Sequence, residues 1–418
     1  MLAPDGDPDQ QPIEYQPVGV TELLSAMKDT SELLVDLAYS ALLHNSPALA
    51  EEVLVLESRM DRLQLQARMN LLLAARNPTN ARQLAPVLGI VGATEKVSEA
   101  AGDIATIVLD ETALVEAIRG ALPEAVEVLA RAELASDSPY AGRTLGAIDV
   151  ETETGVRVIA TRRDDDWAVN PDAATTLTPG TVVLLRGAAE PVAAVYKTVT
   201  GDSYDCAADD TGNRTDTNTG TGSDHGRGHD HDIADLDRAV DSIVLMKDTS
   251  ELAVDLAYAS VLLDDESLAQ EVRSLEVEID TLQSRLETWT LRAAGDVADP
   301  ASLRGLLGLA DSAELISDAA LEIAEGILRD IETHPVIAES VRESEVAVRR
   351  LELSTDSPLA DSTVAAVTET APGVAVIAIR RADGDWLFYP DAAVTTAPGD
   401  TVIVRGTWTA TDELLAAV

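Results

Sequence analysis

The hydrophobic pattern of residues 18–129 has the period of a helix. Apolar side chains recur at spacings of three, four and seven residues, which places them on one helix face. Examples are Leu23, Met27, Leu34, Ala38 and Ala41. Helix breaks are predicted at 45–47 and 77–80, where Ser46 and a threonine or asparagine can cap the following helix. The pattern predicts three long helices and a shorter fourth near 114–128.

The pattern then changes to short β-branched runs separated by Asp, Gly and Pro, which is typical of strands. In order along the chain, these runs are VEVLARAEL, GVRVIATRR, DWAVN and TVVLLRG. A short helix is predicted at 141–150. A type II turn is predicted at 178–180, because proline precedes glycine there, and 397–399 repeats that order.

The whole arrangement occurs twice. MKDTSELLVDLAYSALL begins at Met27 and MKDTSELAVDLAYASVL begins at Met246, an offset of 246 − 27 = 219 residues. The offset slips by one between GVRVIATRR at Gly155 and GVAVIAIRR at Gly373. The polar stretch 201–232 between the copies cannot bury a core, so we expect a flexible linker.

These patterns predict an α+β protein in which two helical bundles alternate with two small α+β domains in a tandem duplication. The predicted segments are a disordered tail at 1–16, helical units at 17–122 and 233–341, β-rich domains at 123–200 and 342–418, and the acidic linker at 201–232.

Net charge changes the picture of the surface. Thirty basic and 74 acidic side chains give −44 over 418 residues. Such a surface stays soluble in a salty cytosol, because molar salt shortens the Debye length to about 3 Å and screens the repulsion. The composition therefore indicates a halophilic source. It also argues against nucleic-acid binding, which requires cationic contacts to phosphates.

The cysteine count and the apolar runs indicate the cellular compartment. Cys206 is the single cysteine, so neither an intrachain disulfide framework nor a cysteine zinc site is expected. No apolar run reaches the length of a membrane-spanning helix, and the first residues lack the pattern of a signal peptide. We therefore expect a cytoplasmic protein, peripheral to the membrane through a partner, with no direct insertion.

Two sets of residues resemble known families. The helical unit carries acidic pairs in its first and third helices, and resembles a three-helix PhoU repeat. The stretch SPYAGRTLGAIDVETETGVRVIATRRDDDWAVNPDAATTLTPGTVVLLRG and its partner at 357–406 resemble a TrkA-C domain. The resemblance implies a regulatory subunit of a membrane cation transporter or channel, with potassium as the first ion and magnesium as the second. No GxGxxG segment of the companion nucleotide-binding domain is present, which argues against NAD or ATP.

By the TrkA-C resemblance, a small ligand is sensed in a groove between two paired domains, and cyclic di-AMP is bound there in some members. The residues that would line this groove are Val158, Ile159, Ala160, Arg162, Asn170, Pro171, Val376, Ile377, Ala378, Arg380, Tyr389 and Pro390. An arginine at a strand end can grip a phosphate with two hydrogen bonds. The alternative is that Arg162 and Arg380 pair with the aspartates that follow each of them.

By the PhoU resemblance, the acidic pairs are candidate ligands for a hard divalent cation such as Mg²⁺. They are Glu32, Asp36, Glu95, Glu99, Glu251, Asp255, Glu314 and Asp318. The competing interpretation is a solvated acidic face, because the acids of the first helix lie nearly opposite its apolar stripe.

No Ser-His-Asp order, phosphate-binding loop or cysteine nucleophile appears, so an enzyme is not expected. Two alternatives to the transport regulator remain: a PhoU-like metal-binding adaptor in phosphate-uptake signalling, and a structural assembly protein. A homodimer is compatible with each of them.

Overall fold

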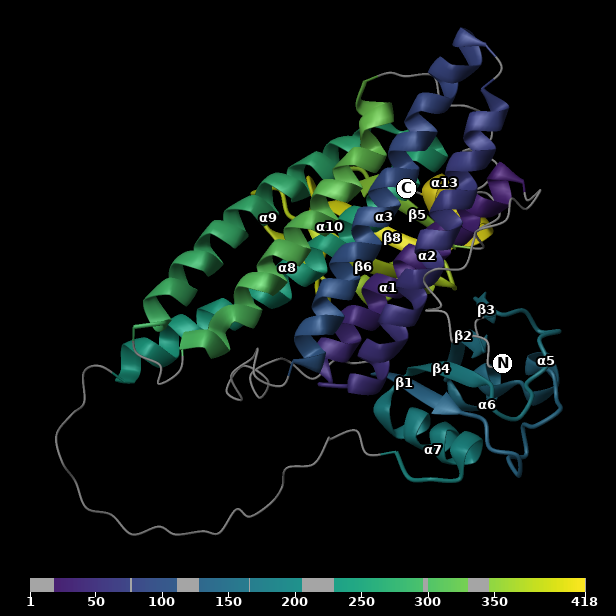
Figure 1. The fold of residues 1–418 in the computed structure, drawn as a ribbon. Helices are drawn as coiled ribbons and strands as arrows, with labels where there is room; N and C mark the ends of the chain where they lie inside the picture. The colour runs from purple at the N-terminus through teal and green to yellow at the C-terminus, as the bar shows by residue number, and fades with distance from the viewer. Residues whose placement is uncertain are drawn as a thin grey trace, which may run out of the picture.

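The computed structural model describes residues 19–75, 77–110, 128–164, 166–204, 229–295, 300–329 and 346–417. Figure 1 shows a long helical bundle with two small sheets against it. The predicted tail at 1–16, most of the predicted fourth helix at 114–128 and most of the linker at 201–232 lie outside the described residues.

The helices of the first half are α1 (Val20–Leu43), α2 (Pro47–Ala74) and α3 (Pro78–Leu109). The predicted break before α2 is confirmed, because the Ser46 hydroxyl accepts a hydrogen bond from the Leu49 N–H at 3.4 Å. Both α2 and α3 begin at a proline, whose fixed φ angle suits the first helical position.

The second half repeats these elements as α8 (His229–Leu263), α9 (Glu266–Ala293), the short 3₁₀ helix η2 (Pro300–Leu303) and α10 (Arg304–Leu328). Asp265 caps α9 by accepting from the Ser267 N–H at 2.8 Å. Among the described residues, no helix is both long enough and apolar enough to cross a membrane.

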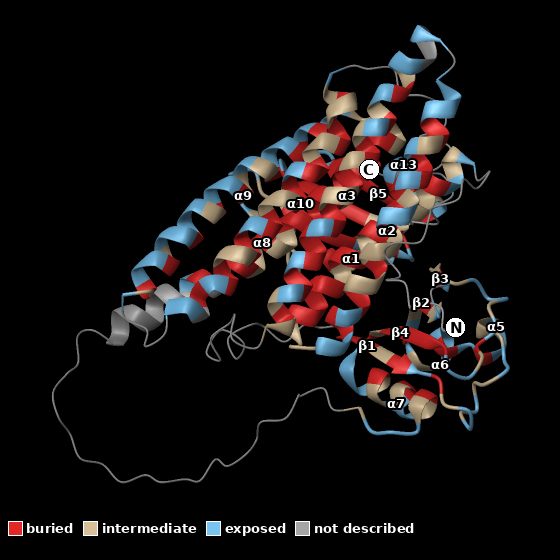
Figure 2. Cartoon of the chain, in the orientation of Figure 1, coloured by how far each residue is buried: buried red, intermediate tan, exposed pale blue. Residues whose placement is uncertain are grey.

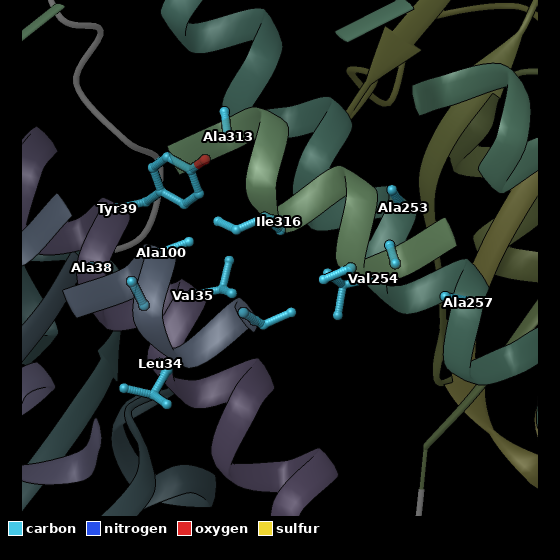
Figure 3. Close-up of a cluster of buried hydrophobic side chains, with 14 of the residues drawn as sticks. Leu34, Val35, Ala38, Tyr39, Ala100, Ala253, Val254, Ala257, Ala313 and Ile316 are labelled. Carbon is cyan, nitrogen blue, oxygen red and sulfur yellow. The ribbon is translucent and has the colours of Figure 1, made fainter. Parts of the chain in front are cut away.

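The two helical units share one hydrophobic core. α3 packs against α10, and α1 meets α8, so that the three helices of each half form a six-helix bundle together. Figure 3 shows side chains from both halves, including Val35, Ala100, Val254 and Ile316, gathered in this core. The tandem duplication therefore folds as a single helical body rather than as two independent ones.

The first sheet contains β1 (Val128–Glu133), β2 (Arg157–Arg163), β3 (Asp166–Val169) and β4 (Val182–Gly187) in the order β1-β4-β2-β3, all antiparallel. All four strands were predicted. The short helices α5 (Leu145–Ile148) and α6 (Val150–Thr154) replace the single helix predicted at 141–150. α7 (Ala189–Thr200) was not predicted.

The second sheet repeats the order as β5-β8-β6-β7. Its strands are β5 (Val346–Glu352), β6 (Val374–Arg380), β7 (Trp386–Phe388) and β8 (Thr401–Thr407), with α12 (Val364–Thr370) and α13 (Trp408–Ala417) beside them. The predicted turns are compatible with the backbone, since Gly180 and Gly399 have φ angles of 82° and 90°.

Each sheet lies between the bundle and helices of its own domain. Alternate residues of β4 divide between two cores: Leu184 belongs to the core of the bundle, and Leu185 to a separate core shared with α7. In the second sheet, Ile403 and Val404 divide in the same way. Figure 2 shows buried residues along the bundle and through the first sheet. One face of each sheet is thus a docking face for the helices.

Candidate functional site

Arginine side chains stand on the docking face of each sheet. In the first sheet, β1, β2 and β4 each supply one arginine that reaches the helices; these are Arg131, Arg162 and Arg186. The second sheet supplies the matching residues Arg350, Arg380 and Arg405. A guanidinium that is largely removed from water needs carboxylate partners, and both sets find them on the helices.

The first set of contacts, which we call the first joint, centres on Glu52 of α2. Arg131 Nε donates to Glu52 Oε1 at 2.7 Å, and Arg162 donates to both Glu52 oxygens, at 2.6 and 2.7 Å. Arg186 pairs with Asp36 of α1 at 3.0 Å. Burial disfavours the charged form of Glu52, but hydrogen bonds from Arg162 and Arg131 outweigh it and lower the pKa of this carboxyl.

The second joint centres on Glu271 of α9, which is the counterpart of Glu52 at the offset of 219. Arg350 Nε and Arg380 Nη2 both donate to Glu271 Oε1, at 3.2 and 2.6 Å. Glu271 Oε2 is buried and has no hydrogen-bond partner within the described part of the chain. Arg405 pairs with Asp255 of α8 at 2.7 Å. The two joints therefore use matching residues with different geometry.

Between the joints, α1 and α8 meet through a pair of matching contacts. The Ser31 hydroxyl lies 3.0 Å from the Tyr258 hydroxyl, and the Tyr39 hydroxyl lies 3.0 Å from that of Ser250. Ser250 and Tyr258 are the counterparts of Ser31 and Tyr39, so one contact is the image of the other. The helices thus meet about a pseudo-twofold axis, as in a symmetric dimer.

The predicted acidic pairs of α1 and α8 lie beside this axis, and each acid has a cationic partner. Lys28 pairs with Glu32 at 2.7 Å, and Lys247 pairs with Glu251 at 2.8 Å. Asp36 and Asp255 bind the arginines of the two joints, as described above. The helices and sheets partly cover these acids, more so in α8 than in α1.

Burial changes the protonation of the second pair in particular. It raises the pKa of Glu251 to about 7, although Lys247 opposes the shift. Burial likewise raises the pKa of Asp255 to about 6, against the opposing charge of Arg405. Acids of both helices act on one another, since Asp36 raises the pKa of Glu251. These four acids form one electrostatic group.

The acidic pairs of α3 and α10 lie elsewhere. Glu95 pairs with Arg68 of α2 at 3.1 Å. Glu99 acts on Glu57 of α2, whose pKa is raised to about 7 by burial and by the charges of Asp61, Asp103 and Glu99. In the second half, burial and nearby carboxylates raise the pKa of Glu314, and Asp318 is the first of those carboxylates.

The eight predicted metal ligands are thus divided between helix faces. Acids of α1 and α8 meet at the helix crossing, whereas acids of α3 and α10 act on those of α2 and α9. Across the described residues, no three of the histidine, cysteine or acidic side chains come together as a metal-binding group. Metal binding at these residues stays a prediction.

Apart from the two arginines, the predicted ligand-groove residues fall into three groups. Ile159 and Ala160, with Ile377 and Ala378, are buried in the core of the bundle. Val158 and Val376 pack on the opposite side of their sheets. The exposed members are Asn170 and Tyr389, which follow β3 and β7 with φ angles of 48° and 44°; Pro171 and Pro390 beside them are half-buried.

Two expectations about these residues need correction. Arg162 and Arg380 reach Glu52 and Glu271 rather than pairing only with nearby aspartates, although Arg162 Nη1 also donates to the Asp164 carbonyl at 3.0 Å. A pairing of the two sheets through their arginine-bearing faces within one chain is also excluded in this arrangement, because helices cover those faces.

The helix partners of the arginines were missed at the sequence level. Glu52 and Arg162 are 110 residues apart, so no local pattern links them. One signal was present: Glu52, Arg131 and Arg186 recur at the offset of 219 as Glu271, Arg350 and Arg405.

Two family models match the chain. The model described as the PhoU domain matches residues 24–108 and 243–327, and the model described as the TrkA-C domain matches residues 129–200 and 348–418. Both are families of regulatory, non-catalytic domains. The four matches alternate along the chain.

Solved structures give a weaker likeness. "GsuK channel bound to NAD" is 16% identical with a TM-score of 0.17, over 70% of this chain and 52% of that chain. "Crystal Structure of the GsuK RCK domain" is 17% identical with a TM-score of 0.18, over 70% of this chain and 64% of that chain. The chain thus spans between half and two thirds of these proteins. No curated protein matches the chain.

Proposed function

We propose that this chain, which belongs to the PhoU and TrkA-C families, is a regulatory subunit at the cytoplasmic side of a membrane cation transporter or channel. Potassium is the ion we expect first and magnesium second. The TrkA-C domains would sense a small ligand, and the shared bundle would carry the response to the transporter.

One observation carries this proposal: each TrkA-C sheet holds carboxylates of the shared bundle through arginines. Arg186 reaches α1 and Arg405 reaches α8, and these two helices meet at the pseudo-twofold axis. A ligand that shifts either sheet must therefore alter charge contacts at the centre of the bundle. Such a ligand shifts the arrangement only if it binds one position of the sheet better than the other.

The exposed ends of β3 and β7 are the surfaces that we propose for the ligand. Asn170 and Tyr389 stand there on strained, left-handed backbone beside prolines. Because the docking faces are covered, any pairing of TrkA-C domains must use other surfaces, and these strand ends are available for it. Cyclic di-AMP is the first probe, because some members of the TrkA-C family bind it.

Calorimetry at high salt with cyclic di-AMP and other nucleotides tests the ligand. We expect binding by the wild type and a loss of about tenfold or more in Asn170→Ala with Tyr389→Ala, equivalent to one or two lost hydrogen bonds. Arg162→Ala with Arg380→Ala should also weaken binding, but by disturbing the joints. An absence of binding to every nucleotide would remove the sensor part of the proposal.

Ion flux tests the partner. A potassium transporter and a magnesium transporter from the source organism would each be placed in vesicles, and the flux of its cation measured with and without the purified chain. A change in flux of one cation on adding the chain is the expected result. Unchanged flux of both, together with binding to a phosphate transporter, would favour the second candidate below.

That second candidate is a metal-binding adaptor in phosphate-uptake signalling. It is favoured by the acidic group around Glu57, whose pKa is raised by burial and then by the charges of Asp61, Asp103 and Glu99. A divalent cation would relieve this repulsion. Titration with Mg²⁺ should then release heat in the wild type and much less in Glu57→Gln.

A further inference from the structure

The two joints differ most at their central carboxylates. Glu52 uses both oxygens, and Arg162 grips it with two hydrogen bonds. Glu271 uses one oxygen for both of its arginines, and the other oxygen is left without a partner in the described structure. A buried carboxylate oxygen without a hydrogen bond costs free energy that a paired one does not. The second joint is therefore the less stable of the two at its centre.

The second difference is a reversed charge at the rim of the joint. In the first half, Arg59 of α2 donates to the Trp167 carbonyl of β3 at 3.3 Å and is attracted by Asp166. Its counterpart in the second half is Glu278 of α9. Burial and the negative charge of Asp385, the counterpart of Asp166, raise the pKa of Glu278. An attraction between helix and sheet has thus become a repulsion.

The other contacts of the second joint do not compensate. Arg405 binds Asp255 at 2.7 Å, but its Nε atom is buried without a partner among the described residues. The Tyr389 hydroxyl reaches Glu251 at 3.4 Å, which is long for a hydrogen bond. The gains in the second half are therefore small beside the loss of the Arg59 attraction.

Apolar contacts also favour the first joint. Ile159 and Ala160 enter the bundle core in the first half, and Ile377 and Ala378 enter it in the second. Ala160 and Ala378 are both 0% exposed. The first sheet also buries Trp167 and Val182 in the bundle core, whereas Trp386 is half-buried and Thr401 replaces Val182 in the second, so the inequality of the joints is apolar as well as electrostatic.

We propose that the second TrkA-C domain undocks from the bundle at low ionic strength and docks again as ionic strength rises, while the first domain stays docked. This goes beyond the proposed function, because it requires neither a ligand nor a transporter. The repulsive pair Glu278 and Asp385 lies at the rim, with Asp385 exposed, so dissolved cations screen it readily. The attractive contacts of Glu271 are buried and respond less to salt. Higher salt therefore closes the second joint.

Thiol labelling of matched positions tests the proposal on the full chain. With Cys206→Ser as background, Ala160→Cys and Ala378→Cys place one thiol under each docked sheet. A thiol there reacts when its sheet leaves the bundle. We expect Ala378→Cys to be labelled about tenfold faster than Ala160→Cys at about 0.1 M KCl, which is the ratio that a difference of about 1.4 kcal/mol in docking produces.

Salt and charge reversal then identify the cause. Between about 0.1 and about 1 M KCl the Debye length falls from about 10 to about 3 Å, and labelling of Ala378→Cys should slow. Glu278→Arg should slow it at low salt, because an arginine there attracts Asp385. Arg59→Glu should accelerate labelling of Ala160→Cys, because it imposes the second half's repulsion on the first.

A further thiol separates undocking from unfolding. Val404 lies in the core on the far side of the second sheet, so Val404→Cys is exposed only when the domain itself unfolds. Rates are compared at salt concentrations where that thiol stays protected. Equal labelling of Ala160→Cys and Ala378→Cys, or no slowing by Glu278→Arg, would overturn the proposal.

Discussion

The two halves agree closely at the centre of the molecule and differ at its joints. Across the pseudo-twofold axis, Ser31 with Tyr258 and Tyr39 with Ser250 make the same contact twice. At the rim of the joints, by contrast, Arg59 in one half corresponds to Glu278 in the other. A duplicated chain thus keeps one symmetric helical body and carries two sheets that are attached to it unequally.

This difference shows which contacts a pseudo-symmetric protein is free to vary. The helix crossing serves both halves at once, so a change there disturbs the shared core. A joint serves one sheet only, and its charges can change without affecting the other sheet. Different attachment strengths let one domain act as a fixed support and the other as the moving part.

The largest effect is expected from removing the central carboxylate of each joint. Glu52→Gln leaves Arg131 and Arg162 largely buried without their charge partner, which should destabilise the first β domain by about 3–5 kcal/mol. Glu271→Gln should cost about 2 kcal/mol, because the wild-type carboxylate already leaves one oxygen unpaired. Calorimetric unfolding of both variants measures the two losses.

An exposed neighbour supplies the control for this comparison. Glu51→Gln removes the same charge from α2 one residue away, on the solvent side, and should stay within about 0.5 kcal/mol of the wild type. If Glu271→Gln proves as costly as Glu52→Gln, the joints are equivalent and their different geometry has no energetic consequence.

A smaller effect is expected at the acidic group between α2 and α3, and it depends on pH. Burial and neighbouring acids raise the pKa of Glu57 to about 7 from an ordinary value of 4.5. The ionised form therefore destabilises the fold above pH 7, and this penalty disappears as the pH falls towards 4.5. Glu57→Gln should stabilise the chain by about 1–2 kcal/mol at pH 8, after allowance for solvent screening of this half-buried group, and leave it unchanged near pH 4.5.

The second half again provides the comparison. Glu276 is the counterpart of Glu57, and burial and Asp280 raise its pKa in the same direction. In the first half, Gly102 has no side chain, and a Cβ at that position would collide with the Glu57 carboxylate. In the second half, Leu321 occupies the position that matches Gly102. Thermal unfolding from pH 4.5 to 8 should show a smaller gain for Glu276→Gln. A larger gain there would contradict the role given to Gly102.

These examples also show how much of the structure can be predicted from the sequence. Helix breaks and strands follow from local chemistry, such as the capping hydroxyl of Ser46, so they were predicted. The unity of the helical core was not, because the pattern of α1 shows an apolar face without identifying what covers it. The partner of Arg162 lies 110 residues away in the sequence, so no local pattern identifies it. The change from Arg59 to Glu278 could be interpreted only after the structure placed Asp166 and Asp385 beside these residues.

The smallest effect tests the symmetry of the core itself. Gly89 of α3 and Gly308 of α10 are counterparts, but a Cβ on Gly89 would meet no atom within 4 Å, whereas one on Gly308 would lie 2.9 Å from Ile107 Cδ1. Since alanine favours a helix over glycine, Gly89→Ala should stabilise the chain by about 0.5–1 kcal/mol. Gly308→Ala should lose most of that gain to crowding.

Ile107→Val deletes the crowding methyl group and completes the test. In a double-mutant cycle, Ile107→Val should restore the stabilising effect of Gly308→Ala and leave that of Gly89→Ala unchanged. Thermal unfolding of the three single variants, the two double variants and the wild type measures both couplings. Equal gains for the two alanine variants would mean that the halves pack symmetrically at this helix contact.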